Sequence, residues 1–313
     1  MARWDILDAI KRREAEPSPG REEPPTKSNS AGPSMGRGGS DASASEIERS
    51  KHSPEVGDRT PRERRTQYQD RGLTYFLRSS EMEAMGDIGR FRTVDVQDLA
   101  RFGYRGDQAH MRQDLENLRA QGLMEEKTVF HAHNTARKLV TLTAEGHRMV
   151  RKASGLKEEQ RLYHGFVKPR ELDHDADLYK VYQKAATQVR EKGGKVLRVR
   201  LDFELKQEIN RARESARKLS GEERARFLWA VAEENGLRAE GSSIHLPDIQ
   251  IEYKTRDGRT ERENLELLSQ NYREAGIRTK ASAGFKIYAR AGEANRIRRA
   301  LHDTGLVREV LSV

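Results

Sequence analysis

Two acidic residues in the C-terminal part of the chain are spaced so that a hairpin would bring them together. Asp248 follows Pro247 at the start of the stretch IQIEYK, where apolar and polar residues alternate as in a half-buried strand. Asp257 and Gly258 supply a turn, and Glu266 lies in the returning stretch. Because carboxylate oxygens are ligands for hard divalent cations, Asp248 and Glu266 are candidate ligands for Mg²⁺ or Mn²⁺.

The same two residues also have plain structural explanations. Asp248 can simply begin a strand after Pro247, and Glu266 can be a solvated edge acid that faces Arg262 or Lys254. Clusters of acidic residues occur in structural ion-pair networks as well as in functional sites. The helices and strands predicted around the hairpin are therefore needed to choose between the two interpretations.

Composition limits what kind of protein can surround this hairpin. The chain has 313 residues, 35% charged and 35% hydrophobic, with a mean hydropathy of −0.93, which indicates a soluble protein of about two domains. It has no apolar run of membrane-spanning length and no apolar signal core, so we expect no membrane partner and a cytoplasmic location. The absence of cysteine excludes disulfides and thiolate metal sites. The net charge of +9 and pI ≈ 9.6 favour a nucleic-acid partner over an inert basic surface, though only modestly.

Residues 1–70 are predicted to form a disordered tail with a short amphipathic leader. Pro, Ser, Gly and Arg dominate most of this segment, which has too few large apolar residues to offset the entropy cost of ordering. In the leader, Trp4, Leu7 and Ile10 fall on roughly one helical side, as in a helix that folds on a protein partner. A frayed leader without function is the alternative.

Residues 71–155 are predicted to form a winged helix-turn-helix domain. Three helices precede two strands: amphipathic helices are expected over Arg78–Ile88, over Val94–Phe102 and from Asp107, and strands over Leu123–Phe130 and Arg137–Thr143. Met111, Leu115 and Leu118 should point inward from the third helix, Gly122 should end it, and Thr143 should cap a closing helix. The segments LENLRAQGLMEE and KLVTLTAEGHRMV are similar to those of winged-helix regulators.

Such a domain would bind double-stranded DNA with its third helix in the major groove. The residues at the start of that helix would then reach base edges, which makes Arg105, Gln108 and Arg112 candidate contacts. The wing would follow phosphates or the minor groove with the polar residues His131, His133, Asn134, Arg137 and Lys138. The alternative for the two histidines is that they are solvated turn residues.

Residues 156–313 are predicted to add an α+β domain. Without two charged helices over Lys206–Lys218 and Glu222–Glu234, the order is helix, three strands, helix, strand. This order resembles the restriction-endonuclease-like αβββαβ core of the PD-(D/E)xK nuclease superfamily. The resemblance implies that Asp248 and Glu266 hold a metal ion and that a lysine two residues after the second acid orients water. Leu268 stands at that position, so Lys280 on the following helix is the nearest substitute, with Lys254 as the other option.

Three further residues lie near this predicted site. Tyr272, just beyond the acid-bearing strand, could be a nucleophile in a nicking mechanism, although an aromatic at such a junction is usually part of the core. His174 and Asp175, near the start of a helix with Leu178, Val181, Tyr182, Ala185 and Val189 inward, could complement the helix N-terminus or pair with the hairpin.

The combination of a winged helix with ELDHDADLY, the Pro-Asp hairpin, ELLSQNYR and KASAGFKIY resembles the replication-relaxation family of plasmids and integrative elements. The resemblance implies a DNA-binding protein involved in replication or conjugal mobilisation. One alternative is a metal-dependent nicking endonuclease, or relaxase. The other is a winged-helix transcriptional regulator whose C-terminal domain forms a homodimer.

Overall fold

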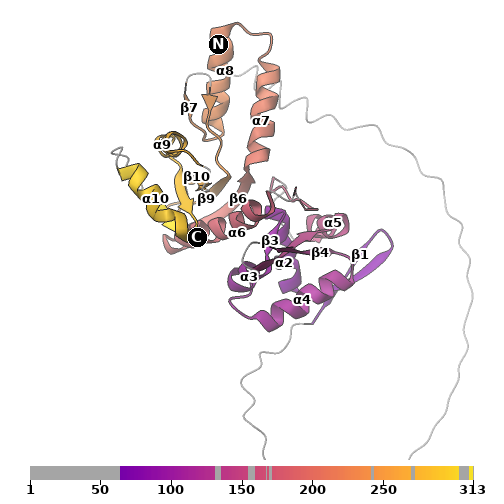
Figure 1. Cartoon of the computed structure of the whole chain (residues 1–313). Coiled ribbons are helices and arrows are strands. Elements are labelled where there is room, and N and C mark those ends of the chain that lie inside the picture. The colour runs from indigo at the N-terminus through magenta and orange to yellow at the C-terminus, as the bar shows by residue number, and fades with distance from the viewer. Residues whose placement is uncertain are drawn as a thin grey trace, which may run out of the picture. The chain divides into compact units, whose positions relative to one another are not determined.

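The computed structural model describes residues 64–130, 135–153, 159–166, 168, 171–240, 243–268, 272–302 and 310–312 (Figure 1). All described residues belong to one compact unit, Thr60–Val313. The predicted leader helix and most of the predicted disordered tail lie outside the described residues. The described residues form a mixed α+β structure, and none of their helices is long and apolar enough to cross a membrane.

A hairpin precedes the first helix and corrects the predicted extent of the tail. Strand β1 (Thr66–Asp70), which we predicted to be disordered, pairs antiparallel with β2 (Leu73–Leu77). Tyr68 lies opposite Tyr75 and packs against the core. This aromatic cross-strand pair stabilises a strand that the polar composition of its neighbours conceals in the sequence.

Three helical segments and a hairpin follow in the predicted order. They are α2 (Ser79–Phe91), α3 (Val96–Asp98) continued by the π-helical turn η1 (Leu99–Gly103), α4 (Gln108–Ala120), β4 (Met124–Phe130), β5 (Ala136–Leu142) and α5 (Ala144–Ala153). Val94 and Asp95, predicted to begin a helix, instead form strand β3 at the edge of an antiparallel sheet of order β3-β5-β4. Val94 lies opposite Val140, and both are fully buried, as suits β-branched side chains on a sheet.

Helix α4 confirms its predicted limits and inward face. The Asp107 side chain accepts a hydrogen bond from the backbone N–H of His110 (2.9 Å) and caps the helix. Its apolar residues Met111, Leu115 and Leu118 are buried. Beyond its end, Gly122 adopts φ 70°, a left-handed conformation that glycine tolerates without steric cost.

The second half of the described chain contains a larger sheet and its helices. In chain order these are α6 (Leu172–Glu191), β6 (Lys195–Leu201), α7 (Asp202–Ser215), α8 (Gly221–Glu234), β7 (Ala239–Glu240), β8 (Ser243–Ile244), β9 (Ile249–Lys254), β10 (Thr260–Leu268), α9 (Glu274–Ser282), β11 (Lys286–Ala289), α10 (Ala291–His302) and β12 (Val310–Ser312). The five-stranded sheet has the order β12-β11-β10-β9-β6. Strands β6, β9 and β10 are antiparallel neighbours, whereas β10, β11 and β12 run parallel.

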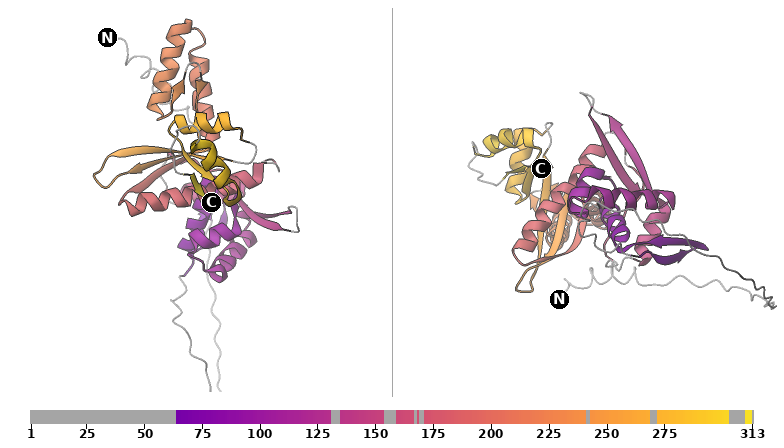
Figure 2. Two further views of the ribbon diagram at one scale, coloured as in Figure 1. Left: turned by 60° about the vertical axis from the view of Figure 1, so that its left-hand side comes forward. Right: turned by 90° about the horizontal axis from the view of Figure 1, so that it is seen from below.

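The helical insertion differs in detail from the sequence expectation. Helix α7 begins at Asp202 rather than at Lys206, because Leu205 and Ile209 both belong to its buried face. Helices α7 and α8 lie side by side and extend away from the sheet (Figures 1 and 2). The small β7–β8 hairpin was not predicted from the sequence.

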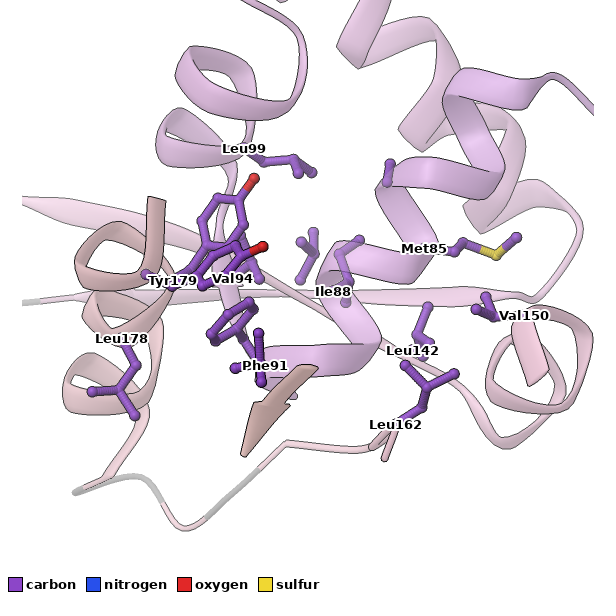
Figure 3. Packing of buried hydrophobic residues seen from close by; sticks show 14 of the residues in the cluster. Met85, Ile88, Phe91, Val94, Leu99, Leu142, Val150, Leu162, Leu178 and Tyr179 are labelled. Atoms are coloured by element: carbon purple, nitrogen blue, oxygen red, sulfur yellow. The ribbon is translucent and has the colours of Figure 1, made fainter. Parts of the chain in front are cut away.

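One hydrophobic core joins elements on both sides of the predicted domain boundary, which falls at residues outside the described ranges. Tyr179 and Leu178 of α6 lie in the same buried cluster as Phe91, Val94 and Leu99 (Figure 3). The Tyr179 hydroxyl also donates a hydrogen bond to Asp87 of α2 (2.9 Å). Helix α6 therefore packs against the elements before the predicted boundary as well as against the five-stranded sheet after it.

Gly146 marks a position where helix α5 touches the backbone before β4. A Cβ added to Gly146 would lie 1.9 Å from the Leu123 carbonyl oxygen, whereas a Cβ on Gly292 of α10 would meet nothing within 4 Å. We expect Gly146→Ala to lower the unfolding free energy by about 1–3 kcal/mol, since overpacking forces backbone shifts. Gly292→Ala should leave it unchanged or raise it by up to about 1 kcal/mol. Urea unfolding of both variants checks this, and equal midpoints would contradict the packing described here.

Candidate acid site and nucleic-acid interface

The β9–β10 hairpin brings Asp248 and Glu266 together, as the sequence predicted. Asp248 immediately precedes β9, and Glu266 lies one residue beyond Leu265, the registered partner of Ile249. The Asp248 backbone N–H donates to Glu266 Oε2 (3.2 Å), and Asp248 Oδ2 accepts from the Leu267 backbone N–H (2.8 Å). Each carboxylate is thus held by the main chain of the opposite strand.

Lys280 and Tyr272 both reach the buried Glu266. The Lys280 ammonium of α9 lies 2.8 Å from Glu266 Oε1 and also donates to the Leu246 carbonyl oxygen (2.6 Å). The Tyr272 hydroxyl donates to the same Glu266 oxygen (2.7 Å). Helix α9 therefore supplies the cation that Leu268 cannot provide on β10.

Burial raises the pKa of Glu266 to about 7, and the nearby Asp248 charge adds to the rise against the opposing Lys280 and Tyr272. Burial also raises the pKa of the Tyr272 phenol above its ordinary value, as do the charges of Glu266 and Asp248. Tyr272 is therefore held protonated as a hydrogen-bond donor. This environment opposes the loss of the phenol proton that the predicted nucleophilic role would require.

His174 of α6 approaches Asp248 from the other side. Its Nε2 lies 3.5 Å from Asp248 Oδ2, and its Nδ1 lies 3.6 Å from Asp175 Oδ1. Burial alone would lower the pKa of His174, but the hydrogen bonds and charges of Asp175 and Asp248 outweigh it and raise the pKa to about 10. The imidazole is thus a cation at neutral pH. Of the two sequence alternatives for His174, the structure supports pairing with the hairpin.

A third cation stands close to the acid pair. The backbone N–H of Asp202, at the start of α7, donates to the Asp248 carbonyl oxygen (3.0 Å). The Asp202 carboxylate in turn forms an ion pair with Lys206, and the charges of Asp248 and Glu266 help to raise the pKa of Lys206. His174 and Lys280 therefore contact the two carboxylates, and Lys206 lies within reach of their charge.

The acid pair matches one mode of Mg²⁺ binding. The described residues contain no group of three or more His, Cys, Asp or Glu side chains arranged to hold a metal ion. Mg²⁺, however, is commonly held by one or two carboxylates, with water and substrate phosphate completing its shell. Asp248 and Glu266 supply that donor set, while Lys280 already neutralises part of their charge.

The predicted recognition residues share an exposed surface at the start of α4. Arg105, Gln108 and Arg112 are all exposed, and Arg112 donates to Gln108 Oε1 (3.1 Å) one helical turn away. On the opposite side, the buried Asp114 accepts hydrogen bonds from Arg78 (2.7 Å) and Ser80 (2.6 Å). These bonds fix α4 against α2, so its exposed face is a rigid platform.

The wing residues divide into two groups. Lys138 is exposed and forms a long contact with Glu126 (3.4 Å). Arg137 is instead committed to three carboxylates: Asp95 (2.7 Å), Asp173 (3.2 Å) and Asp177 (3.1 Å). Its predicted DNA contact would compete with these ion pairs, so the geometry assigns Arg137 to holding the wing against α6. His131, His133 and Asn134 lie outside the described residues.

Sequence reasoning missed the three-carboxylate environment of Arg137. Asp173 and Asp177 are four residues apart in ELDHDADLY and therefore share one helical face, which is a signal for an ion-pairing stripe. Their partner on β5 lies 36 and 40 residues away in the chain, and no local pattern identifies it.

Comparison with known proteins adds little to this geometry. No family model and no curated protein matches the sequence. A crystal structure of Bacillus subtilis PadR in complex with operator DNA aligns with 51% of this chain and 92% of the PadR chain, at 14% sequence identity and a TM-score of 0.22. A likeness at this TM-score is too weak to bear on fold or function.

The His174 environment predicts a distinctive titration. The pKa of His174 is higher in the folded state than in the unfolded chain. Its charged imidazole therefore raises the free energy of unfolding in full below about pH 6.5, and this contribution is lost as the pH rises toward about 10. NMR titration should show His174 changing charge well above the ordinary range, and Asp248→Asn should move its midpoint downward. His147, whose pKa is lowered chiefly by burial, serves as the control in the same spectra and should not respond. An unchanged His174 midpoint in Asp248→Asn would refute the contact between α6 and the hairpin.

Proposed function

We propose that this chain binds duplex DNA through a winged helix-turn-helix formed by residues within 66–153. The carrying observation is the exposed start of α4, where Gln108 and Arg112 share one face of a helix whose other face is fixed in the core, and Arg105 is exposed in the turn that precedes it. Arginine recognises guanine and glutamine recognises adenine through paired hydrogen bonds in the major groove. The helix is therefore equipped for base contacts.

Charge and wing support the same proposal. The net charge of +9 favours a polyanion, since cationic side chains gain affinity by releasing counterions from DNA. Lys138 projects from a wing that follows α4 in the chain and is anchored to α6 through Arg137. A rigid wing beside a recognition helix would place a second contact on the DNA backbone.

We assign the protein to a plasmid or integrative element, with a role in replication or conjugal mobilisation. The resemblance to the replication-relaxation family motivates this assignment. The order of α6, β6, β9, β10, α9 and β11 supports it, because it matches the αβββαβ order of the nuclease-like core. A transcriptional regulator would need the same DNA-binding part but would have no use for an acid pair lined by cations.

A second candidate function is metal-dependent DNA nicking, and the convergence of Asp248, Glu266 and Lys280 favours it specifically. A bound Mg²⁺ or Mn²⁺ would polarise the scissile phosphate and lower the pKa of a water molecule. The chain's own residues would hold the two carboxylates in place and present the Lys280 ammonium beside them. His174 would keep Asp248 oriented.

DNA binding predicts a defined response to salt and to loss of Arg112. Affinity for duplex DNA should fall steeply between low and moderate salt. Arg112→Ala should weaken binding to the preferred sequence by about 1–3 kcal/mol, because a base contact is lost. Fluorescence anisotropy with labelled duplexes measures both effects.

Arg226 of α8 provides the matched control for Arg112. It is also an exposed arginine, and it forms an ion pair with Glu222 one helical turn away. Arg226→Ala should bind DNA as the wild type does. If Arg112→Ala and wild type bind every duplex equally at all salt concentrations, α4 is not the recognition helix.

Nicking predicts that supercoiled plasmid becomes relaxed in the presence of Mg²⁺ or Mn²⁺. Asp248→Asn and Lys280→Met should slow relaxation by about 100-fold or more, since the first removes a ligand that would hold the metal ion and the second removes the ammonium beside it. Lys286→Met, which removes an ion pair with Glu263, should retain the activity. If wild type and Asp248→Asn relax the plasmid equally little, the second candidate fails while the DNA-binding proposal stands.

A further inference from the structure

We propose that Phe130, at the outer end of the wing, inserts between stacked base pairs when the wing binds DNA. This proposal rests on the DNA-binding function above and adds a residue that reads DNA deformability. Phe130 is the last residue of β4, opposite Ala136, the first residue of β5. Its side chain is 80% exposed, the largest value among the exposed large hydrophobic residues in the described part of the chain.

The two faces of the wing have different surroundings. Val129 packs against a cluster that contains Leu139, Leu172 and Ala176, so this face of the hairpin is covered by the start of α6. Consecutive strand residues point to opposite faces, which places Phe130 on the uncovered face. The start of α6 supports the wing on the face of Val129, and the ring of Phe130 is exposed on the opposite face.

A cation shares the face of Phe130. Thr128 lies opposite Lys138, and directly opposed residues in an antiparallel pair project to the same side. Thr128 and Phe130 are two residues apart on β4, so Lys138 belongs to the same face, diagonal to the ring. Its side chain is 63% exposed and can follow a phosphate while the ring enters the groove. Opposite Phe130 stands the small Ala136, which leaves the ring open to its surroundings.

The energies of insertion are close to balance. Unstacking a base step costs free energy, and the stacking of an aromatic side chain on a base recovers a comparable amount. Insertion should therefore be weak at an intact step and clear at a step where stacking is already weakened. Phe130 would thus favour deformable sites.

The test compares two short duplexes of the same sequence, one fully paired and one with a single central mismatch beside 2-aminopurine. Wild type should bind the mismatched duplex on the order of tenfold more tightly than the paired one, since part of the unstacking cost is already met. The 2-aminopurine fluorescence should rise on binding. Phe130→Ala should bind both duplexes with equal affinity and give no such rise, whereas Phe130→Trp should retain the preference.

Phe76→Ala is the matched control, because Phe76 is also exposed (50%) but lies on β2, outside the wing. It should keep the mismatch preference. If Phe130→Ala discriminates the two duplexes as wild type does, insertion is refuted while salt-dependent DNA binding still supports the winged helix. If wild type binds neither duplex, the proposed function itself fails. If Phe130→Ala changes only self-association, the ring contacts another protein and the proposal is overturned.

Discussion

The ion pairs at the start of α6 fix the position of the wing relative to the acid pair. Asp173 and Asp177 accept Arg137 from the wing strand, while His174, between them, contacts Asp248 at the hairpin. Asp177 is nearly fully buried, so removing its partner Arg137 would leave an uncompensated charge, which costs about 3–5 kcal/mol in fully buried pairs and less at this partly exposed one. The first turns of α6 therefore connect the wing strand β5 with the β9–β10 hairpin and restrict how either can move relative to the other.

Asp177 carries most of this arrangement. Its Oδ1 accepts Arg137 (3.1 Å), and its Oδ2 lies 2.7 Å from Arg290, which follows β11 of the large sheet. Lys180 lies nearby as a third cation (3.8 Å from Oδ1). One carboxylate thus links the wing, α6 and the five-stranded sheet. Under the proposed function, DNA held by α4 and the wing would lie at a fixed distance from Asp248 and Glu266.

Local periodicity predicted the elements that depend on local patterns. The inward positions of α4, the turn at Asp257 and Gly258 and the strand β9 all follow from residue spacing, and the structure confirms them. The alternating burial predicted for β9 is wrong, because Gln250, expected on a polar face, is fully buried. Strand β1 escaped prediction because its short polar stretch gains stability only through its partner β2. Val94 and Asp95 look like a helix start in sequence, but pairing with β5 outweighs local propensity.

Some contacts of the acid site were also predictable from local sequence patterns, and others were not. The hairpin pattern predicted that Asp248 and Glu266 would meet, because register fixes which residues oppose each other. That Lys280 reaches Glu266 depends on how α9 packs across the end of β10, which one sequence does not encode locally. The three acidic neighbours of Arg137 were not predicted either, and they give this basic wing residue a structural role that competes with the predicted DNA contact.

Hydrogen–deuterium exchange with and without a short duplex tests the central claim, that DNA binds the face formed by α4 and the wing. The account predicts slower exchange on binding at the start of α4 and along β4 and β5, with α7 and α8 unchanged. Protection confined to α7 and α8 would contradict this claim. So would unchanged exchange at α4 and the wing under conditions where DNA is bound.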